Sequence, residues 1–333
     1  MKPTEGNIEA TAMHVLGIDA GGTKTVCLLA DERGVIVSEG RGPGANLHAA
    51  GELEVEKVLH EVMEAAIGDR VIGEGADARP VEPAAICIGI AGVDRSDEER
   101  TVRAIMRRLG HRSHVLVVND ALIALVAGAC DAAGVVIIAG TGSIAYGRNA
   151  RDEAARAGGW GHMIGDEGRG YWIGREALAA VMRAADGRGP ATRLSDDVLA
   201  HFEVKAVSRL PRIVYDRESP RMAVAALGPL VNRAAAEGDA VATRILERAA
   251  EELVLAARSV VTRLEMRGDA FTFYLAGGAF RSVRWLADDL PRRLVEVAPR
   301  AQTRVLEEEP AVGAVWLALA EARGGARLPR YKG

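Results

Sequence analysis

The stretch VLGIDAGGTKTVCLL, residues 15–29, is the part of the sequence from which the rest can be interpreted. An apolar run reaches Asp19, the pair Gly21 and Gly22 follows, and a second apolar run begins at Val26. Short apolar runs bounded by glycines are typical of buried strands, so this pattern predicts a strand, a tight turn and a second strand. An ordinary hairpin with a glycine turn remains the alternative while this stretch is considered alone.

A glycine turn of this kind can hold phosphate. Glycines allow backbone N–H groups to come close to a ligand, and the hydroxyls of Thr23 and Thr25 add donors. Together they form a concavity suited to phosphate oxygens. Asp19 is an acceptor at the edge of the turn, so it is well placed to bind Mg²⁺, either directly or through water.

The same design recurs in VVIIAGTGSIAYG, residues 135–147. An apolar strand meets the turn of Gly140, Thr141, Gly142 and Ser143, and a second strand follows. Two such units, about 120 residues apart, indicate a duplicated domain. Facing each other across a cleft, the two turns could hold a triphosphate from both sides. A plain hairpin is again the alternative for the second turn.

The first half of the chain alternates strands with helices. Strands are expected at 84–90 and 115–118, and helices at 53–67 and 121–129. This alternation predicts an α/β layer fold with largely buried strands. Asp19 and Asp120 stand where strands finish, and ligands of α/β sheets gather at the carboxyl ends of the strands.

Residues 150–170 are expected to form a long loop that ends in GGWGHMIGDEGRG, residues 158–170. Two carboxylates, Asp166 and Glu167, lie there among glycines and close to Trp160. An aromatic ring beside fixed carboxylates suits a sugar, whose hydroxyls need acceptors and whose C–H face needs an apolar wall. Asp166 could instead cap a helix that begins near Gly168, and the two roles can coexist.

The second half is expected to be mostly helical. A strand at 271–276 ends in Gly277 and Gly278, and such a pair lets a flat ligand such as adenine lie against the backbone. The other expected elements are an amphipathic helix at 171–185, a long helix from Asp239 to about Met266, a helix from Val283 that Pro291 breaks, a strand at 303–306, a helix at 310–322 and a frayed tail from Arg323.

Composition narrows the function classes. A chain of 333 residues favours roughly two domains. The net charge of −4 offers no electrostatic case for binding nucleic acid or an anionic membrane. The sequence lacks an apolar segment of about 18 uncharged residues, so no membrane span is expected, and the cytoplasm is the expected compartment. Cys27, Cys87 and Cys130 lie far apart in apolar runs and are expected to be reduced core residues.

Seven segments resemble, in order, those of the acetate kinase, sugar kinase, Hsp70 and actin superfamily. The closer resemblance is to the N-acetylglucosamine kinase group and its relatives in the BadF/BadG/BcrA/BcrD ATPase family. The segments are GIDAGGTKT (17–25), GPGAN (42–46), VVNDA (117–121), IAGTGS (138–143), GGWGHMIGDEG (158–168), LAGGA (275–279) and PAVGA (310–314). The resemblance implies an α/β chain with two ribonuclease H-like domains, the actin-like ATPase fold, flanking an interdomain cleft. The first would be 14–120, completed by the helix 310–322, and the second 121–309.

The resemblance also implies cofactors and roles. ATP and Mg²⁺ would be bound, with Asp120 as the general base that accepts the proton of the attacking hydroxyl. The remaining roles are phosphate contacts at Gly21, Gly22, Thr23, Lys24, Gly140, Thr141, Gly142 and Ser143, an Mg²⁺ contact at Asp19, sugar contacts at Asn46, Asn119, Asp120, Gly159, Trp160 and Asp166, and an adenosine wall at Gly277 and Gly278.

The implied function is ATP-dependent phosphorylation of an amino sugar, foremost N-acetylglucosamine at its 6-hydroxyl. Glucosamine or a muramic-type sugar fits the same motifs. A BadF-type ATPase that acts on a partner protein is the second hypothesis, although the cysteines that would hold an iron–sulfur cluster in such relatives are missing here. A non-catalytic sugar sensor is the third. The substituent at the second carbon of the sugar and the oligomeric state, with a homodimer as one option, are left open by the sequence.

Overall fold

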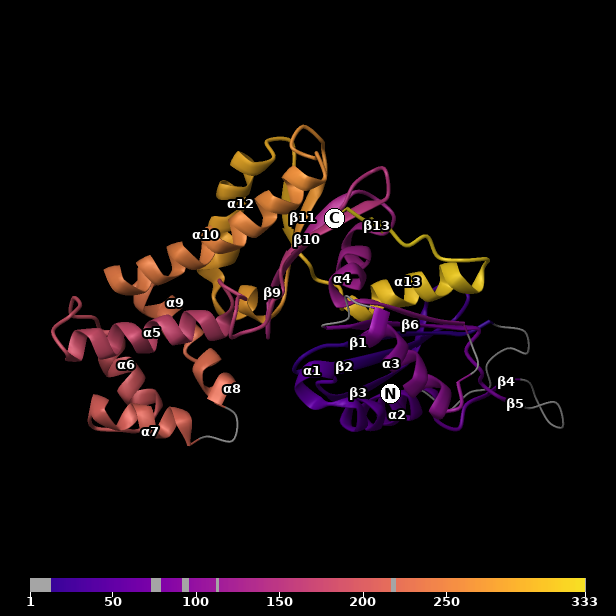
Figure 1. The fold of residues 1–333 in the computed structure, drawn as a ribbon, viewed down its shortest axis with the longest axis horizontal. Helices are drawn as coiled ribbons and strands as arrows, with labels where there is room; N and C mark the ends of the chain where they lie inside the picture. Colours follow the sequence, from indigo (N-terminus) through magenta and orange to yellow (C-terminus); the bar gives the residue numbers. More distant parts are fainter. Residues whose placement is uncertain (1–12, 73–78, 92–95, 112–113, 217–219, 333) are drawn as a thin grey trace, which may run out of the picture. The chain divides into compact units, whose positions relative to one another are not determined.

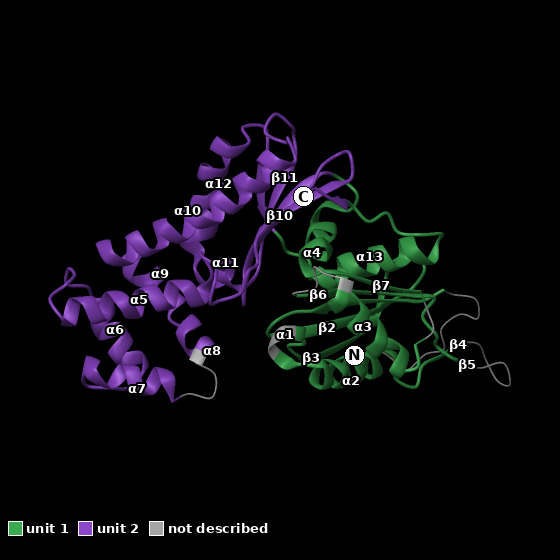
Figure 2. Cartoon of the chain, viewed as in Figure 1, with its two compact units in different colours: residues 1–132, 306–329 green, residues 133–305, 330–333 purple. Residues whose placement is uncertain are grey.

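The computed structural model describes residues 13–72, 79–91, 96–111, 114–216 and 220–332 (Figure 1). The chain forms two compact units (Figure 2). Unit 1 comprises residues 1–132 and 306–329, and unit 2 comprises residues 133–305 and 330–333. Neither unit is a continuous stretch of the chain.

Unit 1 is built on a five-stranded sheet in the order β3-β2-β1-β6-β7. Strands β1 (Val15–Ala20), β2 (Lys24–Ala30) and β3 (Ile36–Pro43) form an antiparallel meander. Strands β6 (Ala85–Ile90) and β7 (His114–Asn119) then run parallel to β1. Every residue of β1 and β6 is buried, as expected for apolar runs covered on both faces.

Helices cover both faces of this sheet (Figure 1). Helices α2 (Glu52–Ile67) and α3 (Ser96–Arg108) pack on one face and share a buried core with β1, β2 and β6. Helices α4 (Asp120–Ala129) and α13 (Pro310–Ala322) pack against each other, and α13 also packs on β1 and β6. The short elements of the unit are α1 (Leu47–Ala50), β4 (Val71–Ile72) and β5 (Arg79–Pro80).

Unit 2 repeats the strand order of unit 1. Strands β8 (Gly134–Ala139), β9 (Ser143–Arg148) and β10 (Glu153–Gly158) form an antiparallel meander, and β11 (Thr272–Ala276) and β12 (Gln302–Val305) run parallel to β8. The sheet order is β12-β11-β8-β9-β10, with β13 added at the edge. This repeat confirms the predicted duplication and the α/β class with two ribonuclease H-like halves.

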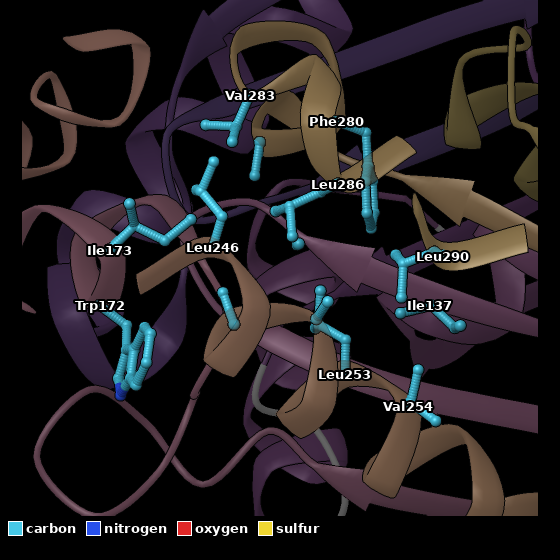
Figure 3. Close-up of a cluster of buried hydrophobic side chains, with 14 of the residues drawn as sticks. Ile137, Trp172, Ile173, Leu246, Leu253, Val254, Phe280, Val283, Leu286 and Leu290 are labelled. Carbon is cyan, nitrogen blue, oxygen red and sulfur yellow. The ribbon is translucent and has the colours of Figure 1, made fainter. Parts of the chain in front are cut away.

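Long helices bury the core of unit 2. Helix α10 (Ala240–Arg263) begins at Asp239, whose Oδ1 accepts a hydrogen bond from the backbone N–H of Ala242 at 2.8 Å. Figure 3 shows the buried cluster to which Trp172, Leu246 and Phe280 contribute. The other helices are α5 (Gly170–Ala185), α6 (Leu194–His201), a 3₁₀ turn (Val207–Arg209), α7 (Leu210–Tyr215), α8 (Pro220–Ala225), α9 (Gly228–Ala236), α11 (Gly278–Ser282) and α12 (Arg284–Val297).

The structure corrects the prediction of a loop over 150–170, because β10 occupies Glu153–Gly158. Its sequence, EAARAG, contains poor strand formers. The strand forms because β9 pairs along one side of it and β13 (Arg330–Tyr331) pairs along the other. The predicted frayed tail is therefore also wrong, since the N–H of Lys332 donates to the carbonyl oxygen of Ala154 at 2.8 Å.

Prolines lie within two regular elements, and the predicted break of a helix at Pro291 is wrong. Strand β3 continues to Pro43, and an edge strand tolerates proline because one side needs no ladder bond. Helix α12 runs through Pro291 without ending there. A proline inside a helix costs about 3 kcal/mol, and the buried side chains of Leu286, Leu290 and Leu294 offset this cost by packing.

The structure differs from two further predictions. Cys27 and Cys87 are buried as predicted, but Cys130 is exposed, with a φ of 50° at the end of α4. Unit 1 extends beyond the predicted limit at residue 120, because α4 packs against α13. Across the described ranges, every helix is too short or too polar to cross a membrane.

Candidate functional site

The carboxyl ends of three parallel strands of unit 1 meet at one edge of its sheet. In the register, Asp19 of β1 lies beside Gly89 of β6, and Gly89 lies beside Val118 of β7. The last residue of β7 is Asn119, and Asp120 begins α4. The two aspartates predicted to do the chemistry therefore belong to the same edge, as the strand-end rule expects.

Asp19 is buried and sits in a negative environment. Burial raises the pKa of its carboxyl group to about 7, and the charges of Asp120 and Glu309 add to this effect. Lys24 acts in the opposite direction. The structure thus brings Asp19 and Asp120 within electrostatic reach of each other and adds Glu309, which the sequence analysis did not single out.

The start of α4 is fixed by Asn119. Its Oδ1 accepts a hydrogen bond from the backbone N–H of Ala121 at 2.8 Å, which is the geometry of a helix cap. Asp120 therefore occupies the first turn, where the helix dipole favours a negative charge. Asn119 is the last residue of β7, and because its side chain caps α4 it also positions Asp120.

The first glycine turn packs against the segment that carries Asn46. The N–H of Gly21 donates to the carbonyl oxygen of Lys24 at 3.1 Å, and the N–H of Ala45 donates to that of Gly21 at 3.0 Å. A Cβ at Gly44 would lie 2.5 Å from the carbonyl oxygen of Gly22, so only glycine fits there. The predicted phosphate turn and the predicted sugar contact Asn46 thus belong to one structure in unit 1.

Lys24, a predicted phosphate contact, pairs with Glu309. Its Nζ lies 2.8 Å from Oε2 of Glu309, and Nη1 of Arg41 lies 3.4 Å from Oε1. Burial tends to raise the pKa of Glu309, but the hydrogen bond and charge of Lys24, with those of Arg41, hold it below its ordinary value. Glu309 directly precedes the PAVGA segment, and that adjacency was the signal available in the sequence.

The second glycine turn lies in unit 2 between β8 and β9. The N–H of Gly140 donates to the carbonyl oxygen of Gly142 at 2.8 Å. Ser143 binds both ends of the glycine-rich loop, because its carbonyl oxygen accepts from the N–H of Gly159 at 2.8 Å and its hydroxyl donates to the carbonyl oxygen of Glu167 at 2.7 Å. The predicted phosphate turn and the predicted sugar loop are therefore joined.

Asp166 is a buried carboxylate on a strained backbone. Its φ is +63°, and it is 5% exposed. Its Oδ1 accepts from the N–H of Gly161 at 3.2 Å, and burial raises the pKa of the carboxyl group even though Arg169 opposes this. Helix α5 begins at Gly170 without a capping side chain among the described residues, so the capping alternative for Asp166 is wrong. Strain held in place by surrounding contacts is typical of functional positions.

Trp160 and Gly159 lie in the same loop. Trp160 is 61% exposed, and Cζ of Arg156 lies 5.0 Å from the centroid of its ring. An exposed ring held by a cation offers the apolar wall that a sugar face needs. The structure thus gathers Gly159, Trp160 and Asp166 in unit 2, whereas Asn46, Asn119 and Asp120 belong to unit 1.

The glycine pair after β11 lies against the second phosphate turn. Gly277 has a φ of 106°, and a Cβ there would lie 2.4 Å from the carbonyl oxygen of Ala139. A Cβ at Gly140 would lie 3.9 Å from the Cα of Gly277. Helix α11 starts at Gly278. The predicted adenosine wall and the predicted phosphate turn are therefore neighbours within unit 2.

Comparison with known proteins identifies the family to which the chain belongs. Residues 16–318 match the family described as the BadF/BadG/BcrA/BcrD ATPase family. The chain is 37% identical over 309 residues to the N-acetylmuramic acid/N-acetylglucosamine kinase of Clostridium acetobutylicum, covering 92% of this chain and 99% of that protein. It is 33% identical over 311 residues to the N-acetyl-D-glucosamine kinase of Dictyostelium discoideum, covering 91% and 97%.

Solved structures share the fold. A protein structure from Chromobacterium violaceum has a TM-score of 0.71 at 24% identity, and the match covers 92% of this chain and 99% of that protein chain. A ROK family glucokinase from Streptomyces griseus, solved with glucose and AMPPNP, has a TM-score of 0.59 at 18% identity, covering 95% and 100%. The predicted actin-like ATPase fold is therefore confirmed. Since the family match spans most of the sequence, the chain belongs to the BadF/BadG/BcrA/BcrD ATPase family.

Proposed function

We propose that this protein is an ATP-dependent kinase that transfers the γ-phosphoryl group to the 6-hydroxyl of N-acetylglucosamine. The observation that carries the proposal is the pairing of Asp19 and Asp120 at one sheet edge, in a chain whose relatives are named as amino-sugar kinases. Phosphoryl transfer depends on positioning and charge neutralisation, with one carboxylate orienting the nucleophile. The sheet edge of unit 1 has two carboxylates, one of which can orient the nucleophile, beside a glycine turn that can position phosphate.

Asp120 is the general base. As the 6-oxygen of the sugar attacks the γ-phosphorus, Asp120 accepts the hydroxyl proton, and the bond between that phosphorus and the β–γ bridging oxygen breaks, so ADP leaves. Asn119 fixes the helix start that carries Asp120. Backbone N–H groups of the two glycine turns would balance the charge of the phosphates.

The residues around Asp19 fit Mg²⁺. Magnesium prefers oxygen ligands and keeps several waters. After burial, the charges of Asp120 and Glu309 help to raise the pKa of Asp19. A bound divalent cation would reduce the repulsion among these carboxylates. Asp19 would hold Mg²⁺, directly or through water. Among the described residues, no group of three or more His, Cys, Asp or Glu is placed to hold a metal ion. When bound, Mg²⁺ would neutralise phosphate charge.

The remaining predicted contacts divide between substrates. Asn46, Gly159, Trp160 and Asp166 would bind the sugar, and Gly277 and Gly278 would line the adenosine. Exclusion of water from the bound substrates would limit wasteful ATP hydrolysis. The cytoplasmic compartment and a homodimer stay predictions.

The direct test is ADP release from ATP and Mg²⁺ with a panel of amino sugars. We expect release that depends on N-acetylglucosamine, with the product phosphorylated at its 6-hydroxyl. A neutral sugar without the amino group serves as the specificity control. ATP hydrolysis that no sugar changes would contradict the proposal and favour an ATPase that acts on a partner protein.

A further inference from the structure

A buried cation in the sugar loop has no role in the mechanism above. Arg169 is 4% exposed and immediately precedes α5. Throughout the part of the chain that the structure describes, its Nε and Nη2 atoms meet no hydrogen-bond acceptor. Oδ2 of Asp166 lies 3.9 Å from Nε, which is too far for a hydrogen bond. Burying a charge without hydrogen-bond partners is costly, so this arrangement points to an absent partner.

The surroundings of Arg169 are rich in positive charge. Burial lowers the pKa of Arg169; Asp166 and Tyr171 oppose this, while Arg221 and Arg175 add to it. Arg221 and Arg169 also act together on His162 of the same loop, whose pKa is lowered first by burial and then by these two charges. Asp166 is the carboxylate that acts on Arg169 against the charges of Arg221 and Arg175, and Glu167 acts on Asp166 in turn. Oδ1 of Asp166 is already engaged by the N–H of Gly161. The local charge therefore favours an anion.

The ring of Tyr171 holds the guanidinium in place. Cζ of Arg169 lies 5.0 Å from the ring centroid, and the ring of His162 meets Tyr171 edge-on at 6.1 Å. Contact with a ring face restrains the guanidinium, whose Nε and Nη2 atoms are buried without a hydrogen-bond acceptor among the described residues. A carboxylate matches two parallel N–H groups of arginine, so it is the ligand that this geometry suits.

We propose that Arg169, supported by Arg221, forms a subsite for a carboxylate carried by the acceptor amino sugar, as in a muramic-type sugar with its lactyl group. The proposal rests on the proposed function, because Asp166 and Trp160 in the same loop are the expected sugar contacts. A nucleotide phosphate is the rival source of negative charge. The sugar is favoured because Asp166, the carboxylate at 3.9 Å from Arg169, is itself an expected sugar contact.

The first test uses the unaltered protein. We expect the KM for N-acetylmuramic acid to be about tenfold lower than that for its methyl ester, which lacks the charge, because a hydrogen bond to a charged group is worth roughly a factor of ten or more. Equal KM values for acid and ester would overturn the subsite. If no amino sugar supports ADP release, the proposed function fails; if N-acetylglucosamine does so and the acid is not preferred to its ester, this inference alone fails.

The second test uses variants. Arg169→Gln should raise the KM for N-acetylmuramic acid about tenfold or more and change the KM for N-acetylglucosamine less than about twofold. Arg221→Gln, at an exposed position that should fold normally, should raise the KM for the acid by roughly twofold to fivefold. Arg183→Gln, an exposed arginine on α5, is the matched control and should change neither.

Two readouts separate this subsite from other roles of Arg169. If Arg169→Gln raised the KM for ATP equally with both sugars, the anion would be a phosphate and the proposal would be wrong. Arg169→Met should keep or raise Tm, because it removes a poorly compensated buried charge, while the preference for the acid over the ester is lost. A marked fall in Tm with the preference retained would assign Arg169 a structural role and overturn the subsite.

Discussion

Units 1 and 2 share one sheet topology, but their strand ends differ in chemistry. In unit 1, Asp19 is the second-to-last residue of β1, and β7 finishes at Asn119 with Asp120 directly after. In unit 2 the first and fourth strands finish at Ala139 and Ala276, followed by glycines. The topology decides where a ligand binds, and the side chains at the same edge decide whether that edge supplies charge or only backbone.

This difference suggests a division of labour. The carboxylates of unit 1 suit proton transfer and a metal ion, both of which need localised negative charge. The glycine-lined edge of unit 2 suits neutral surfaces and phosphates, which need close backbone approach. Four predictions test this contrast, in order of decreasing expected effect.

The largest effect is expected at Asp120. Asp120→Asn should lower kcat by a factor of about 10² to 10⁴ at unchanged Tm, because a general base is lost while the shape is kept. The measurement is steady-state ADP release with N-acetylglucosamine, and Asp131→Asn, an exposed position beyond α4, is the control. A variant that stays folded and retains more than about a tenth of the rate would remove Asp120 from the mechanism.

The glycine edge of unit 2 can be tested by adding one methyl group. Gly277→Ala should lower the free energy of unfolding by about 2 kcal/mol or more and raise the KM for ATP, because its φ is +106° and the new Cβ would meet the carbonyl oxygen of Ala139. Gly278→Ala is the control for stability, since a Cβ there would meet no described residue within 4 Å apart from its own stretch of chain. Equal losses of Tm at the two positions would contradict the steric argument.

Ionisation of Asp19 should lower the stability of the fold, although the side chain is needed for activity. The pKa of its carboxyl group is raised from 3.8 to about 7, so the folded state holds the proton more tightly and stability falls as pH rises from about 4 to about 7. Asp19→Asn cannot ionise, and it should raise Tm in a chelator by roughly 5 °C at pH 8 and by less at pH 5. It should also abolish most activity. A gain in Tm that is the same at both pH values would show that ionisation of Asp19 is not the cause.

The smallest effect is expected at Glu309. Its ion pair with Lys24 is partly exposed, and such pairs contribute at most about 1 kcal/mol. Glu309→Gln should therefore change the KM for ATP no more than about fivefold, and the effect should shrink at high salt. Glu307→Gln, an exposed neighbour, is the control. A change of 100-fold or more would make Glu309 part of the catalytic set.

Features encoded within a few residues could be predicted from the sequence. The two glycine turns, the cap at Asp239 and the helix that begins at Pro310 were all correctly placed, because strand runs, caps and prolines act locally. The carboxylates of unit 1 could also be placed together, because parallel strands present their ends at one edge.

Features that depend on distant contacts could not be predicted. Strand β10 exists because its neighbours pair with it, and α12 passes Pro291 because its apolar face is buried. Glu309 meets Lys24 across a sequence separation of 285 residues. Arg169 lies inside a segment that was singled out for its carboxylates, yet burial without hydrogen-bond acceptors is visible only in three dimensions.

The return of the chain to unit 1 through α13 has a practical consequence for expression. A gene fragment that stops after residue 132 encodes every strand of the first sheet but omits the helix that covers β1 and β6. Such a fragment would present an uncovered apolar sheet face to water and should precipitate. Production of unit 1 by itself therefore requires residues 306–329 to be supplied, either by a fusion that joins them to residue 132 or as a co-expressed peptide.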